Sequence, residues 1–576
     1  MRARSLALLV LFLLPVAVGS RQASDLGVVS TTGLVVSSSD IASDLGAGIL
    51  ARGGSAVDAA VATAFAMAVT YPTAGNLGGG GFMVVRAPDG EAVAFDYREV
   101  APGGATETMY LDGNGDIDRS LTAAGYLAPG VPGTVHGMAL AHGRFGRLPW
   151  RDVVMPAARL AAEGFRMSAS LARGLNGQVR GAMSAFPASV KAYGKPGGGE
   201  WVEGDVIVLP DLARSLTAIA NDGADAFYTG WIADRIAEDM AVNGGLITKA
   251  DLAAYRAKER TPITGSFLGY DIISMPPPSS GGIAMVEMLN MLEALEIQKT
   301  ERASTESLHL IAESMRRAYL DRARYLGDTD FVDVPVERLT SKTHARELAA
   351  TIDRDRASAS AELGKDIVTV VLPAESDETT HFSVIDEDGM AVSNTYTLEG
   401  GYGSHVVIAG TGILLNNEMG DFNKEPGTTN ARGDIGTTAN MIEPGKRMLS
   451  SMTPTIVTRN GSVVLVTGSP GGRTIINTVL NIVLNVTAWN MTGRDAIDAS
   501  RSHHQWLPDR LSVETQDVTD STIEGLRALG HEVRTGGRQG SAQSIWVHPT
   551  TGHAYGIADM RSPDARASVP VVEGNR

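Results

Sequence analysis

Short segments with alternating hydrophobic and polar positions recur in pairs, and each pair is joined by turn-forming residues. This alternation is typical of half-buried strands, and the Asn460-Gly461 dipeptide is a strong signal for a tight hairpin turn. The pattern therefore predicts four β-hairpins. Their strands are residues 82–86 with 92–97, 381–385 with 390–397, 455–458 with 462–467, and 544–548 with 553–558.

Helical patterns precede the hairpins and lie between them. Residues 56–70 are apolar nearly all round, with Asp58 as the only charge, so we expect a buried helix with Ser55 as its cap. Further helices are predicted at 212–221, 233–243 and 473–489. The Pro- and Gly-rich run 275–282 cannot be helix or central strand, and a helix starts after it. Helices combined with hairpins predict an α+β fold with helices packed on antiparallel sheets.

Hairpin register predicts which residues meet at the open end of each hairpin. If Asp386 faces Met390, Thr397 faces Thr379, because cross-strand partners keep a constant index sum. Residues 340–378 are polar and charged, and this composition predicts an exposed, mobile segment before Thr379.

The predicted registers of the first and third hairpins bring glycines, hydroxyl side chains and an arginine to the open ends of these hairpins. The first hairpin places Arg98 beside 78–81, and the third places Ser450 and Ser451 beside 470–472. We interpret these open ends as candidate functional positions.

Composition narrows the function classes. The net charge of -16 argues against a nucleic-acid-binding protein, which needs a basic face. The chain has no cysteine, which excludes disulfides, Cys-ligated zinc, iron–sulfur clusters and a Cys nucleophile. His503 and His504 are neighbours whose side chains point to opposite faces of a strand, so they are a poor metal pair. We predict no metal and no cofactor.

The N-terminal residues resemble a targeting signal. Arg2 and Arg4 precede an apolar run, 6–14, followed by Pro15 and small residues. This order is typical of a cleaved signal peptide, assigned here to residues 1–20. We therefore expect a periplasmic or secreted protein without a membrane anchor after cleavage.

Thr379 has two possible interpretations. A Thr pair at the start of a strand usually lies at a solvated edge. If the chain is cut before Thr379, however, the new α-amino group can serve as base for the threonine hydroxyl, because its pKa is about 7.7–8.0. Thr397 could then hydrogen-bond that hydroxyl. Residues 468–472 could form an oxyanion hole, or simply an ordinary strand-to-helix turn.

Eight segments, taken in order, resemble the γ-glutamyltransferase (γ-glutamyltranspeptidase, glutathione hydrolase) family. The resemblance covers nearly the whole chain after the signal. The segments are 75–83, 97–102, 275–282, 379–381, 412–417, 449–452, 467–472 and 503–506.

The resemblance implies an N-terminal-nucleophile hydrolase with a four-layer αββα sandwich. It also implies a precursor that cuts itself between Glu378 and Thr379, into a large subunit, 21–378, and a small catalytic subunit, 379–576. Thr379 would be the nucleophile and Thr397 its supporting threonine. Gly471 and Gly472 would form the oxyanion hole.

The same resemblance assigns substrate contacts. Arg98, Ser450 and Ser451 would hold the α-carboxylate of a γ-glutamyl substrate such as glutathione. Asp421, flanked by Glu399 and Glu418, would hold its α-amino group. The residue chemistry agrees, because Arg binds carboxylates bidentately and carboxylates bind an ammonium. The γ-glutamyl group would pass to water or to an amino acid or peptide acceptor.

Departures from the family pattern leave alternatives open. Glu399 stands where many members carry Asn, and Glu418 where others carry Gln. Arg432 stands at a lid position that is Tyr in several bacterial members, inside a retained lid-length segment, 426–447. The balance of hydrolysis and transpeptidation therefore stays open. Arg98 could instead form a surface ion pair, and Asp421 a simple turn.

Two other functions remain as alternatives. One is a glutaryl or cephalosporin acylase of the same fold, whose substrates lack the α-amino group. The other is a non-enzymatic binding protein that stays uncut.

Overall fold

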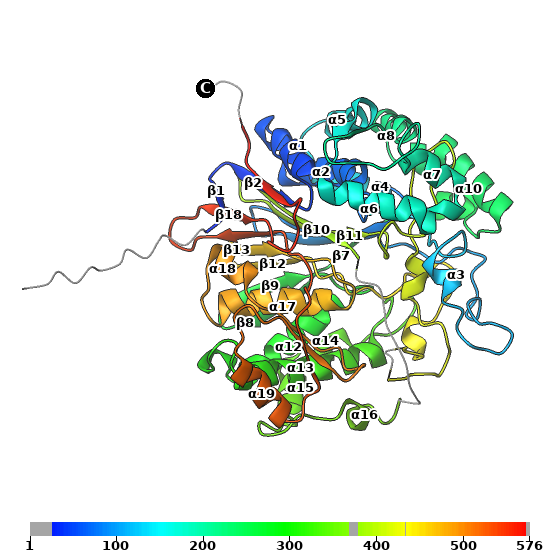
Figure 1. Ribbon diagram of the computed structural model, residues 1–576. Helices are drawn as coiled ribbons and strands as arrows, with labels where there is room; N and C mark the ends of the chain where they lie inside the picture. Colours follow the sequence, from blue (N-terminus) through cyan, green and yellow to red (C-terminus); the bar gives the residue numbers. More distant parts are fainter. Residues whose placement is uncertain (1–25, 368–377, 432–433, 572–576) are drawn as a thin grey trace, which may run out of the picture.

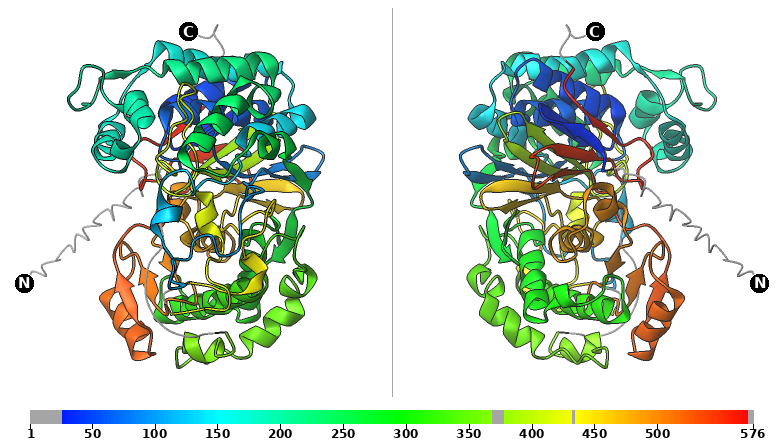
Figure 2. Two further views of the ribbon diagram at one scale, coloured as in Figure 1. Left: turned by 90° about the vertical axis from the view of Figure 1, so that its right-hand side faces the viewer. Right: turned by 90° about the vertical axis from the view of Figure 1, so that its left-hand side faces the viewer.

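Two stacked β-sheets, each covered by helices on its outer side, form the body of the protein (Figure 1, Figure 2). The computed structural model describes residues 26–367, 378–431 and 434–571. Both sheets have seven strands. The layers run helices, sheet, sheet, helices, and this confirms the predicted αββα sandwich of the α+β class.

The first sheet contains the hairpin that begins after Thr379. Its strands are antiparallel. In spatial order they are β19 (Arg566–Ser568), β2 (Gly33–Ser37), β10 (Thr380–Asp386), β11 (Ala391–Thr397), β3 (Gly80–Arg86), β4 (Ala92–Asp96) and β7 (Lys258–Arg260).

The second sheet carries the strand that leads into the glycine loop 468–472. In spatial order its strands are β1 (Val28–Ser30), β18 (Ala554–Ile557), β17 (Ser544–Val547), β13 (Ser462–Thr467), β12 (Thr455–Arg459), β9 (Tyr270–Ser274) and β8 (Ile263–Phe267). Two small sheets lie outside the sandwich. They consist of β5 (Phe165–Arg166) with β6 (Val206–Ile207), and of β14 (Ser502–His503), β15 (Leu511–Val513) and β16 (Val533–Thr535).

Helices of the first half of the chain cover the first sheet, and later helices cover the second (Figure 1). The first group is α1 (Asp40–Ala51), α2 (Ala56–Thr70), α4 (Thr134–Phe145), α5 (Trp150–Glu163), α6 (Ala169–Arg180), α7 (Pro187–Tyr193), α8 (Pro210–Asp222), α9 (Asp225–Tyr228), α10 (Trp231–Asn243) and α11 (Lys249–Ala254). The second group is α12 (Gly281–Ala294), α13 (Thr305–Tyr325), α14 (Val336–Leu339), α15 (Lys342–Ala349), α16 (Ser360–Leu363), α17 (Thr474–Thr487), α18 (Gly493–Asp498) and α19 (Asp520–Ala528). The short α3 (Ser120–Ala123) and the 3₁₀ helices η3 (Glu418–Asp421) and η4 (Thr438–Asn440) lie near the cavity described below.

Strand alternation divides the core between the layers. Met83 and Val85 of β3 pack toward the first helical layer, whereas Phe82 and Val84 join the cluster shared by the two sheets. Successive side chains of a strand point to opposite faces, so a strand inside the sandwich is buried on both sides. All seven residues of β3 are buried, as this arrangement requires.

The predicted buried helix and its cap are confirmed in α2. All of its residues are buried, Asp58 included. Ser55 Oγ accepts from the Asp58 amide at 3.1 Å, and Asp58 Oδ2 accepts from the Ser55 amide at 2.9 Å, which forms a capping box.

Two of the three register predictions hold. Thr380 pairs with Tyr396, which sets Thr379 level with Thr397, and Phe82 pairs with Asp96, which sets Arg98 beside Gly80. The third register is offset by one residue beyond the turn, although Ser450, Ser451 and Gly472 still line one cavity. A register shift between Val457 and Thr458 places Thr455 opposite Thr467. A β-bulge adds one residue to a strand without changing the turn, so turn counting alone misses it.

Part of the segment predicted to be exposed and mobile forms helices. Helices α15 and α16 lie within it. Residues 368–377 of that segment lie outside the described residues.

Candidate active site

A cavity of about 380 Å³ opens at the end of the sandwich where Thr379 begins the β10 segment. Nine of the ten predicted site residues line it. They are Thr379, Thr397, Gly472, Arg98, Glu399, Glu418, Asp421, Ser450 and Ser451. Gly471, the tenth, lies beside Gly472 in the loop after β13. Residues far apart in sequence thus meet in one place, which the register of two hairpins makes possible.

The peptide bond before Thr379 lies against two threonine hydroxyls. Thr379 Oγ1 donates to the Glu378 carbonyl oxygen at 2.6 Å, and Thr397 Oγ1 reaches the same oxygen at 3.3 Å. The Thr397 oxygen also accepts from the Glu399 amide at 2.8 Å. Thr397 Oγ1 therefore accepts from the Glu399 amide and donates to the Glu378 carbonyl. Both threonine side chains are buried.

Arg98 follows β4 and is completely buried. Its guanidinium forms ion pairs with Glu418 and Asp421, and Nε donates to the Met448 carbonyl at 3.3 Å. The surface ion-pair alternative is wrong, since Arg98 is buried and forms part of the cavity lining. Glu99 lies farther away, with Oε2 at 3.8 Å from Arg98 Nη1.

More acidic than basic side chains surround Arg98 at the cavity wall. Burial raises the pKa of Glu99 to about 8, and it raises the pKa of Glu418 well above its usual range in spite of Arg98. The carboxylate of Glu399 adds to this field, and it lies near Gly420 on the adjoining turn. Raised pKa values mean that these acids hold a proton unless a cation stabilises their charged form, so this wall suits a substrate ammonium.

Asp421 lies at the end of the 3₁₀ helix η3. Its side chain is 38% exposed, whereas those of Arg98 and Glu418 are 1% exposed. A ligand can therefore reach Asp421 most directly of the three.

Ser450 and Ser451 precede β12. The Ser450 carbonyl accepts from the Ser280 amide at 2.8 Å and from Ser280 Oγ at 2.6 Å. Ser450 Oγ accepts from the Met452 amide at 3.1 Å. The Ser451 hydroxyl accepts from Arg322 Nη2 at 3.1 Å. Arg322 also lines the cavity, although no sequence motif singled it out.

Gly471 and Gly472 form the turn between β13 and α17. Their φ angles are +130° and +52°, a region that side chains disfavour. Their carbonyls accept from the amides of Thr474 and Ile475 at 2.9 and 3.2 Å. Within the described residues, neither glycine amide donates to the protein, so both are available to an oxyanion.

The predicted lid segment contributes to the cavity. Its lining members are Thr428, Asp434, Ile435, Thr437 and Asn440. Asp434 forms an ion pair of 2.5 Å with Arg119 across the cavity rim. Arg432 lies outside the described residues.

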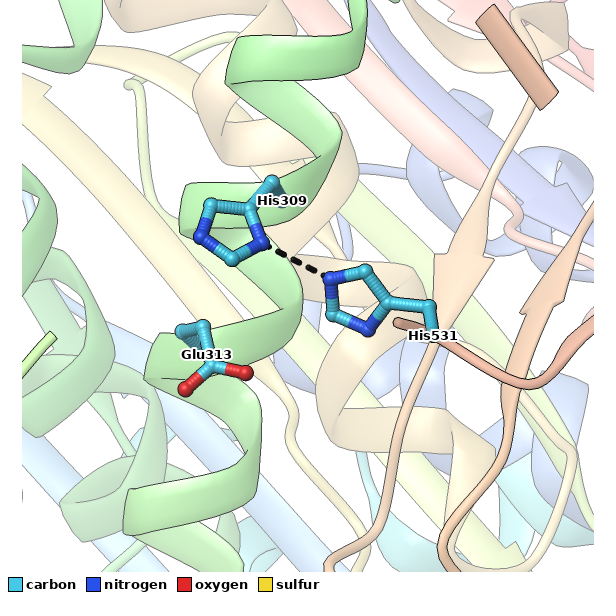
Figure 3. Close-up of side chains that lie close together, drawn as sticks. All are labelled: His309, Glu313 and His531. Carbon is cyan, nitrogen blue, oxygen red and sulfur yellow. Dashed lines mark hydrogen bonds between the residues drawn. The ribbon is translucent and has the colours of Figure 1, made fainter. Parts of the chain in front are cut away.

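Two clusters among the described residues contain potential metal ligands, His309 with Glu313 and His531, and Glu287 with Asp321 and His344, and Figure 3 shows the first. His309 and Glu313 project from α13, and His531 faces His309, with 2.8 Å between His309 Nδ1 and His531 Nε2. Glu313 already accepts from Arg316 at 3.2 Å and Arg317 at 2.6 Å. A metal would have to break these contacts beside two guanidinium groups, so the cluster fits a hydrogen-bond network better than an ion.

His503 and His504 also have protein partners. Asn477 Nδ2 lies 2.7 Å from His503 Nδ1, and His504 Nε2 lies 3.1 Å from Asp509 Oδ1. Among the described residues, no helix is both long and apolar enough to cross a bilayer.

Comparison with known proteins connects this geometry to one family. Residues 42–569 match the family model for Gamma-glutamyltranspeptidase. The glutathione hydrolase proenzyme of Escherichia coli (strain K12) is 47% identical over 534 residues, covering 92% of this chain and 91% of that protein.

Solved structures show the same similarity. The Helicobacter pylori gamma-glutamyltranspeptidase structure is 43% identical with a TM-score of 0.56, over 57% of this chain and 94% of that chain. A cephalosporin acylase from Bacillus halodurans is 26% identical with a TM-score of 0.80, over 94% of this chain and 96% of that chain. The protein described here belongs to the gamma-glutamyltranspeptidase family.

Proposed function

We propose that the chain is a precursor that cuts itself between Glu378 and Thr379, and that the product is a γ-glutamyl transferase and hydrolase. The large subunit would be 21–378 and the small subunit 379–576. A periplasmic or secreted location is a further proposal, supported by the sequence pattern of residues 1–20. The observation that carries the proposal is the pair of threonine hydroxyls on the Glu378 carbonyl.

Self-cleavage begins with attack by Thr379 Oγ on the Glu378 carbonyl carbon. The new C–O bond forms as the C–N bond breaks, and the hydroxyl proton passes to the Thr379 nitrogen. Thr397 donates to the carbonyl oxygen, where negative charge develops. Water then hydrolyses the ester, which leaves Glu378 as a carboxylate and Thr379 with a free α-amino group.

Turnover uses the same hydroxyl. The Thr379 amine accepts the proton while Oγ attacks the γ-carbonyl of glutathione or another γ-glutamyl compound. The amides of Gly471 and Gly472 stabilise the oxyanion, and the amine of the substrate leaves with a proton. Water or an acceptor amine then takes the γ-glutamyl group from the ester. Two covalent half-reactions of this kind give ping-pong kinetics.

Substrate recognition is divided between two sides of the cavity. The α-carboxylate would bind Arg98, Ser450 and Ser451, and the α-ammonium would bind Asp421 with Glu399 and Glu418. Bound substrate would then share Arg98 with the carboxylates that neutralise it here. Desolvated carboxylates facing an apolar glutaryl chain would be costly, and this supports a γ-glutamyl over a glutaryl substrate.

A gel and one pair of substrates test the proposal. A denaturing gel with N-terminal sequencing should give a small fragment that starts at Thr379. γ-Glutamyl-p-nitroanilide should be hydrolysed much faster than glutaryl-p-nitroanilide, whereas the reverse order would indicate the acylase alternative.

Thr379→Ala should abolish cutting and turnover. Thr380→Ser is the matched control, because it keeps the hydroxyl that contacts Ser38 Oγ at 3.4 Å. An uncut, inactive wild-type chain would favour the binding-protein alternative.

A further inference from the structure

Arg322 connects three parts of the structure at the wall of the cavity. It lies on α13, in the outer helical layer of the second sheet, and is 8% exposed. Its Nε donates to Ser280 Oγ at 2.9 Å, and its Nη2 donates to Ser451 Oγ at 3.1 Å. One buried side chain thus joins α13, the residue before α12, and the serine pair of the cavity.

The chemistry of the guanidinium determines how these hydroxyls are oriented. Arginine has only donors, so each hydroxyl that it contacts must accept through its oxygen. The proton of Ser280 is therefore directed elsewhere, and it reaches the Ser450 carbonyl at 2.6 Å. By the same argument, the proton of Ser451 points away from Arg322.

Ser450 is oriented in a similar way by the main chain. The Met452 amide donates to Ser450 Oγ at 3.1 Å, which leaves the Ser450 proton free to donate. The two neighbouring hydroxyls at the cavity wall are thus both presented as donors. A carboxylate has only acceptors and can use both donated protons, whereas a carboxamide has one oxygen and would place its NH₂ group against the other donated proton.

We propose that Arg322 is a positioning residue that makes Ser451 a donor to the substrate α-carboxylate and, through Ser280, holds the main chain of Ser450. It contributes to the selection of a free α-carboxylate over an α-carboxamide without contacting the reacting atoms. This inference rests on the proposed γ-glutamyl function.

Two γ-glutamyl donor substrates that share the same leaving group measure this selection. The first is γ-glutamyl-p-nitroanilide, and the second is the same compound with its α-carboxylate converted to the carboxamide. Arg322→Met should raise KM for the first about ten- to hundredfold, the range of one lost hydrogen bond to a charged group. KM for the carboxamide should change little, and kcat should change less than KM. Arg322→Lys should restore part of the selectivity, since one ammonium can donate to Ser451 but is less suited to bridge both serines.

A double-mutant cycle separates positioning from general support of the fold. If Arg322 acts through Ser451, Arg322→Met should raise KM much less in the Ser451→Ala background than in the wild type, and the remaining effect should match that of Ser280→Ala. Additive effects, or equal loss for both donors, would overturn the inference. Ser280→Ala tests the second branch and should raise KM for the carboxylate donor alone.

Maturation is checked for every variant on a denaturing gel. If Arg322→Met remains uncut, Arg322→Lys and Ser280→Ala carry the test. Wild-type enzyme that turns over neither donor would defeat the proposed function. Wild-type enzyme that prefers the carboxylate donor, with the preference unchanged in the Arg322 and Ser280 variants, would defeat this inference alone.

Discussion

The hydroxyl of Thr397 lies 3.3 Å from the carbonyl oxygen of Glu378, the same atom that accepts a hydrogen bond from Thr379 Oγ1. The nucleophile and a polarising donor therefore meet at the bond proposed for cleavage. The Glu399 amide donates to Thr397 Oγ1 at 2.8 Å and helps to hold the Thr397 hydroxyl in place. This relationship links β10 and β11 directly to maturation.

Removal of the Thr397 hydroxyl should slow self-cleavage. One lost donor to a developing oxyanion typically costs about 10²–10³ in rate, so we expect Thr397→Ala to mature that much more slowly. Thr397→Ser keeps the hydroxyl and should stay within about tenfold of the wild type. Fragment appearance after translation or refolding, followed on gels, gives the rates. Cutting of Thr397→Ala at the wild-type rate would contradict the role assigned to this hydroxyl.

Removal of Arg98 should destabilise the fold as well as weaken substrate binding. Arg98→Met leaves Glu418 buried without its partner, and breaking a buried pair costs about 3–5 kcal/mol. Adding Glu418→Gln replaces the unpartnered carboxyl with a neutral amide and should recover part of the stability. Thermal unfolding of the single and double variants measures this. Equal stability of Arg98→Met and the wild type would mean that the pair contributes no net stability.

Asp421 should discriminate substrates by their α-amino group. Asp421→Asn removes the most exposed of the carboxylates around Arg98, so kcat/KM for γ-glutamyl-p-nitroanilide should fall about tenfold or more. Hydrolysis of glutaryl-p-nitroanilide, which has no ammonium, should not fall. Asp434→Asn, at the Arg119 contact on the rim, is a matched control. A parallel loss for both substrates would show that Asp421 does not bind the ammonium.

Stability should decrease as the pH rises because of a buried triad beneath the second sheet. Glu287 of α12 lies 3.5 Å from His344 Nε2, which is 2.8 Å from Asp321. Burial raises the pKa of Glu287 from 4.5 to about 8, and the two acids raise the pKa of His344. Arg338 also acts on both acids. The folded chain therefore binds more protons than the unfolded chain between pH 4.5 and 8, and stability is lost across that window.

Glu287→Gln isolates this effect. The variant should flatten the pH dependence of the unfolding free energy by up to about 1.4 kcal/mol per pH unit, the value for one proton. Denaturant titrations on the uncut Thr379→Ala chain keep unfolding unimolecular. Glu296→Gln, at an exposed pair with Lys299, should leave the slope unchanged. A slope that Glu287→Gln does not alter would place the proton uptake elsewhere, with Glu99 and Glu418 as the next candidates.

Local sequence signals predicted the elements that carry the site. The tight turns of the hairpins set the register that brings Thr379 level with Thr397 and Arg98 beside Gly80. Ser55 and Asp58 likewise cap their helix through contacts three residues apart. Hairpin turns and helix caps depend on residues close together in the sequence, so they can be predicted from the sequence alone.

The register error in the third hairpin has a different origin. The unpaired residue is Val464, because Val457 faces Leu465 and Thr458 faces Val463, and it lies in β13, which pairs with β12 on one side and β17 on the other. Packing against both neighbours decides where the extra residue fits, and the turn at Asn460-Gly461 does not report it.

By itself, the sequence determined the hairpins, the buried helix, the threonine pair at the site and the resemblance to the family. Only the tertiary structure decided that Arg98 is neutralised by Glu418 and Asp421, and that Arg322 reaches Ser451 from another layer. Hairpin and capping contacts follow from local spacing, which turn geometry and helix period prescribe. Contacts between groups more than a hundred residues apart depend on how the four layers pack, and no local pattern records that packing.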